Sequence, residues 1–203
     1  MNFKKVWLVS LTLFVTVSGF GQRGEYTHDG FFLNLGLGVN FSSVNTKVED
    51  VYDVDFTGAG SAIDILVGGS PTENFALHAT IRSDGTQNPN FDDGNESGNT
   101  TDTILGTGFW GVGCTVYSQD NFFFSTSIGR GAIVLDNGSE TITSDGGLGL
   151  YLRCGKEWWV GKQWGLGVSL DYLAAGGTTD LINDQQEKWT SNNFSISFSA
   201  TLN

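Results

Sequence analysis

The side chains with the chemistry to form a functional site are a few charged groups within segments rich in glycine and serine. Each occupies a polar position in a two-residue alternation, so each would share one face of a sheet with its polar neighbours. Arginine and carboxylate groups on one face can pair, and histidine can act as an acid, a base or a metal ligand. The set is Asp64, His78, Arg82, Arg153, Glu157 and Asp171.

Outside this set, the sequence has few residues or motifs that indicate catalysis or metal binding. The sequence contains no zinc-ligand spacing, phosphate-binding loop or nucleophile elbow. No catalytic residue, metal site or cofactor is therefore predicted. The second histidine, His28, precedes the first alternating segment and is expected in a mobile tail.

The elements that position the charged set are strands. At the C-terminus, apolar residues from Phe194 to Leu202 alternate with polar residues from Ser195 to Asn203, which indicates a strand with one apolar face. Seven further segments repeat the pattern. The eight predicted strands cover residues 33–41, 59–68, 75–82, 110–117, 122–129, 148–155, 165–172 and 194–203.

The links between these strands alternate in length. Those at 69–74, 118–121 and 160–163 are short and rich in turn-forming residues, whereas those at 42–56, 84–103, 135–146 and 175–192 are long. Membrane β-barrels sort their links in this way, with tight turns at one end and long loops at the other. The pattern predicts an all-β, antiparallel, up-and-down barrel of about eight strands. An extra hairpin in the longest loops would make ten.

Alternation alone does not say which face points outward. A soluble lipocalin-like carrier would place its apolar face inside, around a ligand. A transmembrane barrel is favoured, because the polar face combines a few charges with many small residues, as a narrow interior requires. Aromatic residues beside the short turns fit a girdle at the membrane interface: Trp158, Trp159, Trp164 and Phe122.

The interior of such a barrel has two possible roles. Its charges either form a salt-bridged plug or line a narrow pathway, and the plug is favoured because side chains fill a barrel of this size. His78 is either a hydrogen-bonded interior residue, which is favoured, or the histidine of a lipid-modifying enzyme. Cys114 and Cys154 fall on strands separated by a third, about 10 Å or more apart, so no disulfide is predicted.

The N-terminus indicates export. Lys4 and Lys5 precede an apolar run over 6–17, with small residues up to Gly21, so residues 1–21 are predicted to be a cleaved signal peptide and 22–203 the barrel domain. The formal net charge of −12 argues against a nucleic-acid partner. Acidic residues concentrate in the long loops, so any surface ligand is expected at loops 84–103 and 175–192.

The run from Gly155 to Leu170, GKEWWVGKQWGLGVSL, resembles the penultimate hairpin of small outer-membrane β-barrel proteins, and the whole pattern resembles the OmpA/OmpX-type eight-stranded domains. The resemblance implies a location in the bacterial outer membrane, contact with its lipid and insertion by the barrel-assembly machinery. Such barrels usually end in an aromatic residue, and Asn203 departs from that pattern.

The sequence therefore predicts a non-enzymatic outer-membrane barrel that displays acidic surface loops and has a charged, plugged interior. Three alternatives remain open: a narrow pore, a lipid-modifying barrel enzyme and a soluble lipocalin-like carrier.

Overall fold

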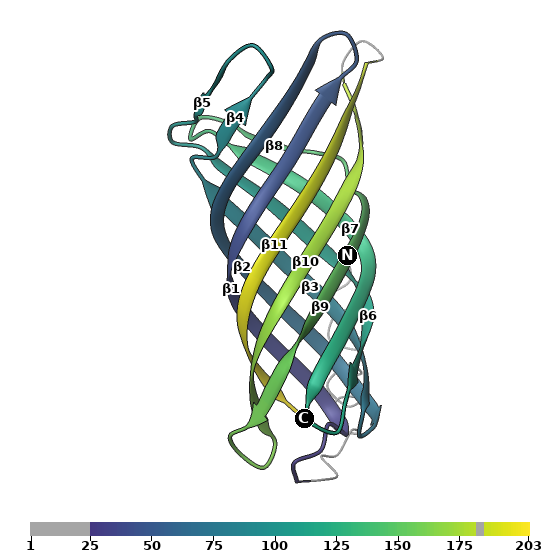
Figure 1. Cartoon of the computed structure of the whole chain (residues 1–203). Coiled ribbons are helices and arrows are strands. Elements are labelled where there is room, and N and C mark those ends of the chain that lie inside the picture. The colour runs from purple at the N-terminus through teal and green to yellow at the C-terminus, as the bar shows by residue number, and fades with distance from the viewer. Residues whose placement is uncertain (1–24, 182–184) are drawn as a thin grey trace, which may run out of the picture.

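The chain folds into a tall, closed barrel of tilted strands (Figure 1). The computed structural model describes residues 25–181 and 185–203; the predicted signal peptide lies outside them. Within these ranges the ring comprises eight antiparallel strands, closed because β1 pairs with both β2 and β11, and the predicted fold is confirmed. The ring strands are β1 Gly30–Val48, β2 Tyr52–Thr72, β3 Phe75–Gln87, β6 Ile104–Tyr117, β7 Phe122–Asp136, β9 Gly147–Trp159, β10 Trp164–Asp180 and β11 Gln186–Leu202.

Three short strands lie outside the ring. β4 (Asn90–Asp92) and β5 (Ser97–Asn99) form a hairpin beside β2, and β8 (Thr141–Thr143) pairs with β7. All three belong to long links, so in the described residues they extend the wall rather than make a ring of ten. In the same ranges, no helix has the length and apolar character to cross a membrane.

The two ends of the barrel differ as the link lengths predict. The turn end carries the short links, such as 118–121 and 160–163. The loop end differs from the prediction, because two of its four long links are mostly strand. β1 and β2 continue until only residues 49–51 join them, and β10 and β11 are joined by 181–185. The predicted loops 42–56 and 175–192 are therefore wrong in length.

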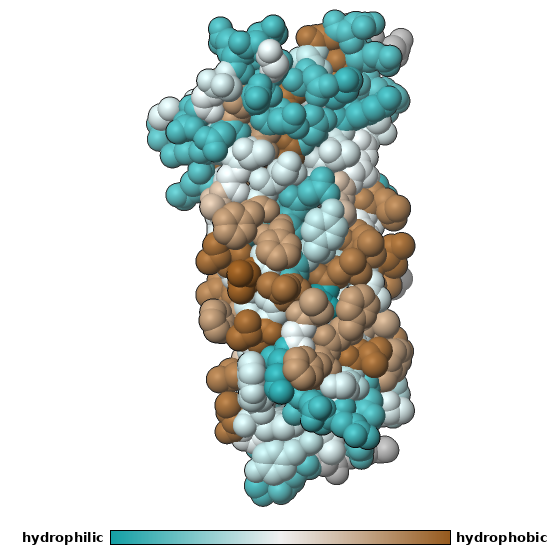
Figure 2. Space-filling view, viewed as in Figure 1, coloured by the Kyte–Doolittle hydropathy of each residue, from teal (hydrophilic) through white to brown (hydrophobic). Residues whose placement is uncertain are grey.

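The apolar face of the sheet points outward. Leu37 and Phe198, for example, are 64% and 69% exposed, whereas their polar neighbours on the same strands face the interior. Figure 2 shows the apolar side chains as a belt between two hydrophilic ends. This arrangement is the reverse of a lipocalin, so the soluble-carrier alternative is wrong.

Apolar side chains also pack together in clusters inside the barrel. At the turn end, Phe32, Leu66 and Ala76 pack with Tyr117 and Phe123. A second cluster toward the loop end packs across the barrel from several strands and consists of Val44, Leu105, Ile133, Ala175 and Trp189. Between the two lies a polar section, and this section contains most of the predicted site residues.

Candidate functional site: a charged cluster inside the barrel

Five charged side chains from four strands meet in the polar section. Their positions share the inward phase of the alternation, so neighbouring strands deliver them to one volume. All five are buried, at 2% exposure or less. We call them the charged cluster: Asp64 on β2, Arg82 and Asp84 on β3, Arg153 on β9 and Asp171 on β10.

Arg82 is the most highly connected member. Its Nε and Nη2 donate to the two carboxylate oxygens of Asp84 at 2.8 and 2.6 Å, a bidentate geometry. Its Nη1 donates to the Tyr151 hydroxyl at 2.7 Å and lies 3.4 Å from Asp171 Oδ2. The guanidinium also stacks on the Tyr151 ring, 4.6 Å from its centroid, and Nη2 donates to Ser195 Oγ at 2.6 Å. These contacts tie β3 to strands across the barrel.

Arg153 connects the remaining carboxylates. Its Nε donates to Asp171 Oδ1 at 3.2 Å, and its Nη1 lies 3.2 Å from Asp64 Oδ1. The same Nη1 donates to the side-chain carbonyl of Asn34 at 2.8 Å. Asp171 thus lies between both guanidinium groups, and two cations face three carboxylates, all of them buried. Removing any one member of such a cluster would leave a buried charge without its partner and would lower the stability of the fold.

Sequence reasoning missed Asp84, because it assigned this residue to the loop after β3. The residue lies two positions beyond Arg82, and side chains at i and i+2 share a face of a strand. That spacing was the available signal for the pair.

Glycine provides the space that the carboxylates need. A Cβ at Gly36 would lie within 2.3–2.7 Å of the Asp64 carboxylate, and one at Gly165 would lie 2.1 Å from Glu157 Oε1. Real Cβ atoms do not approach that closely, so alanine at either position would displace the charged group. Some of the glycines in the strands are therefore needed because the buried carboxylates occupy the space that a side chain would fill.

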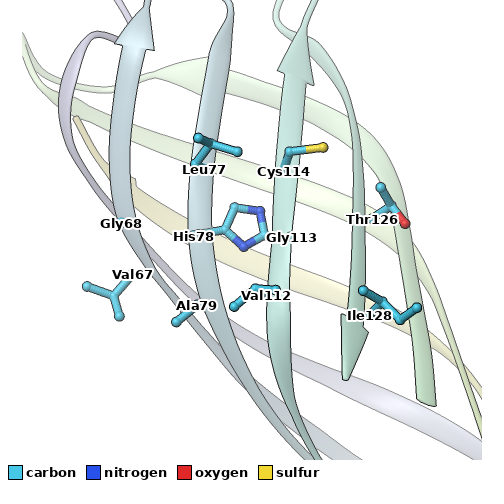
Figure 3. Close-up of a pocket in the computed structure, with 10 residues that line it drawn as sticks. All are labelled: Val67, Gly68, Leu77, His78, Ala79, Val112, Gly113, Cys114, Thr126 and Ile128. Atoms are coloured by element: carbon cyan, nitrogen blue, oxygen red, sulfur yellow. The ribbon is translucent and has the colours of Figure 1, made fainter. Parts of the chain in front are cut away.

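His78 belongs to a separate group of hydroxyl-bearing side chains. Its ring is buried, with Nδ1 3.0 Å from Thr80 Oγ1 and Nε2 3.0 Å from Thr115 Oγ1. Gly68 and Gly113 are its partners on the flanking strands (Figure 3). A Cβ at either glycine would collide with the backbone of the adjacent strand. Both ring nitrogens thus have hydroxyl partners, as expected of a histidine in an interior polar network.

Glu157 is not part of the charged cluster. It lies at the turn end, where Thr201 donates to its Oε2 at 2.6 Å. Its Oε1 lies 3.9 Å from Nδ1 of His28. The expected mobile tail is wrong for His28, which is 3% exposed and stacks on Tyr117 with ring centroids 3.5 Å apart. A histidine ring is flat and amphipathic, so it can seal the aromatic turn end against Tyr117.

The predicted interface aromatics separate into two groups. Trp158, Trp164 and Phe122 are about half exposed on the outer surface beside the short turns. Lys156 lies 4.4 Å from the Phe122 ring centroid, a cation–π distance. Trp159 instead packs against His28, at 4.8 Å between ring centroids, so its ring belongs to the aromatic group at the turn end.

The cysteines are unpaired, as predicted. Cys114 on β6 and Cys154 on β9 are aligned with different residues of β7, which runs between them. Cys114 lies on the outer wall near Leu77 (Figure 3).

Comparison with known proteins identifies the architecture. No protein-family model matches the chain, and no curated protein matches its sequence. Solved structures share its fold at low identity, among them the following three. Neisserial surface protein A has 10% identity and a TM-score of 0.54, and the match covers 85% of this chain and 96% of that one. OprG from Pseudomonas aeruginosa has 8% identity and a TM-score of 0.54, covering 87% and 98%. AlkL has 13% identity and a TM-score of 0.51, covering 90% and 94%.

The fold is that of a small outer-membrane β-barrel. At such low identity the likeness extends to the fold alone, and the interior residues must be understood from their own contacts. In this barrel those contacts fill the polar section with ion pairs and leave apolar clusters on either side of it.

Proposed function

We propose that the chain is a non-enzymatic protein of the bacterial outer membrane, with a closed interior and acidic loops at the cell surface. The apolar belt would lie in lipid, the turn end would face the periplasm, and the barrel-assembly machinery would insert the chain. The loops near Asp92, Asp93 and Glu96 and the β10–β11 link would contact any surface ligand.

The burial of the charged cluster between two apolar clusters is the observation that supports a closed interior. An open aqueous pathway would hydrate the guanidinium groups, whereas Arg82 and Arg153 are each 2% exposed or less. A barrel of this size fills its interior with side chains.

Two measurements test the proposal. Cell fractionation should recover the protein with outer membranes, with heat-dependent migration on gels; recovery in the soluble fraction without detergent would contradict the location. Purified protein in planar bilayers should be electrically silent next to a porin as positive control. Unitary conductance steps that change with Arg153→Ala would instead show a pore.

The enzyme alternative has a separate test. His78→Ala should leave the composition of outer-membrane lipid unchanged relative to the wild type. A lipid modification that is lost in this variant would show that the barrel is an enzyme.

A further inference from the structure

The loop end contains an apolar pocket above the second apolar cluster. Its walls come from the extension of β2 on one side and from β6, β7 and β8 on the other, and its cavity volume is about 330 Å³. Ligand pockets are typically about 300–1,000 Å³ and mostly apolar, so this one suits a small molecule. The apolar wall consists of Val54, Phe56, Leu105, Ile133, Leu135 and Ile142.

A polar group lies at one side of this pocket. The Tyr52 hydroxyl donates to Glu187 Oε1 at 2.6 Å, and both side chains line the cavity. The phenol is the donor in this hydrogen bond. Glu187 can accept further hydrogen bonds, because a carboxylate has about four acceptor sites.

Among the described residues that line the pocket, Glu187 is the single charged side chain. The nearby cations are exposed: Lys188 follows Glu187 in the outward phase of β11, and Lys47 pairs with Asp53 at 2.7 Å. The pocket therefore combines an apolar wall with one carboxylate, Glu187, to which neither Lys188 nor Lys47 is paired.

We propose that this pocket binds a small amphipathic cation, such as an arylalkyl amine, with its apolar body against Phe56 and Leu135 and its ammonium on Glu187. Charge-assisted hydrogen bonds to a carboxylate are stronger than neutral ones. The site therefore selects amines over neutral or acidic molecules of the same shape. It depends on the geometry of the loop end and not on whether the interior conducts ions.

The test uses refolded protein in micelles and the methyl NMR signals of Ile133, Leu135 and Ile142. 2-Phenylethylamine should shift these signals saturably, with weaker binding by 2-phenylethanol and weaker still by 3-phenylpropionate. Glu187→Gln should raise the Kd of the amine about tenfold, to the level of the alcohol. Glu49→Gln, an exposed carboxyl on the neighbouring turn, is the matched control and should leave the Kd unchanged.

A second variant keeps the proposal testable if Glu187→Gln does not fold. Ile142 is 56% exposed on β8, so Ile142→Trp should fold and fill the pocket, abolishing binding of amine and alcohol alike. The proposal fails if wild type binds the three probes equally, if Glu187→Gln keeps the amine preference, or if the amine gives only non-saturable shifts from partition into micelles.

Discussion

Replacing Arg82 with methionine tests the charged cluster most directly. The substitution keeps an unbranched apolar side chain of similar reach but removes the guanidinium. Asp84 then loses a bidentate partner, and the Tyr151 hydroxyl and Ser195 lose a hydrogen-bond donor. Arg153 alone would face all three carboxylates of the cluster.

The expected loss is large. Removing one member of a buried ion pair costs about 3–5 kcal/mol, because the remaining charge stays buried without its partner. Asp84 is at 1% exposure and cannot recover water without distorting β3. We therefore expect the free energy of unfolding to fall by about 3–5 kcal/mol in Arg82→Met.

The double variant Arg82→Met, Asp84→Leu separates charge balance from lost packing. It again leaves one more carboxylate than guanidinium in the cluster, as in the wild type. Replacing both members of a buried pair with apolar residues is often neutral or stabilising. The double variant should therefore be at least about 2 kcal/mol more stable than Arg82→Met, because Asp84 is no longer buried without its partner.

Urea unfolding of the refolded barrel in micelles, followed by tryptophan fluorescence, measures these differences. Lys47→Met is the control, because it breaks an ion pair in which both side chains are 51% exposed and should leave the midpoint unchanged. The reasoning is refuted if Arg82→Met is as stable as the control, or if the double variant is no more stable than the single one.

Two further predictions concern packing and pH. Gly36→Ala should lower stability by about 1–3 kcal/mol, because its Cβ would meet the Asp64 carboxylate; Gly85→Ala, with nothing within 4 Å of its Cβ, should not. Burial lowers the pKa of His28 from its usual 6.5 to about 4. The segment that carries His28 therefore binds more protons when it is detached from the barrel than when it is packed against it. Packing of this segment should weaken as the pH falls from about 6.5 to 4. Protease cleavage within 25–29 should increase over that window, and stronger protection at low pH would show that attraction to Glu157 outweighs burial.

The sequence predicted the ring and its two faces because alternation is strict where one face meets lipid and the other the interior. It failed at the loop end for the same reason. Beyond the apolar belt the outer face is solvated, so alternation in hydropathy fades while backbone pairing continues. Asn45 and Asp53, for example, are outward residues that hydrogen-bond across the β1–β2 hairpin. Polar residues on a solvated strand cannot be told from a loop by periodicity.

The site was predictable in part. Asp64, Arg82, Arg153 and Asp171 follow from strand phase, but phase does not specify height along the barrel. Glu157 shares the phase and still lies apart, at the turn end. His28 could not be placed, because its burial depends on tertiary contacts with Tyr117 and Trp159 that leave no local pattern.

The charged cluster also has a consequence for strand register. Side chains alternate faces, so a one-residue slip of β3 against its neighbours would turn Arg82 and Asp84 toward the apolar belt. An arginine on the lipid face near the middle of a membrane costs about 2–4 kcal/mol, in addition to the ion pairs lost inside. A barrel lined only with serine and glycine would lack this penalty. The buried charges therefore contribute to specifying one register of β3, even if an apolar interior of equal volume would be as stable.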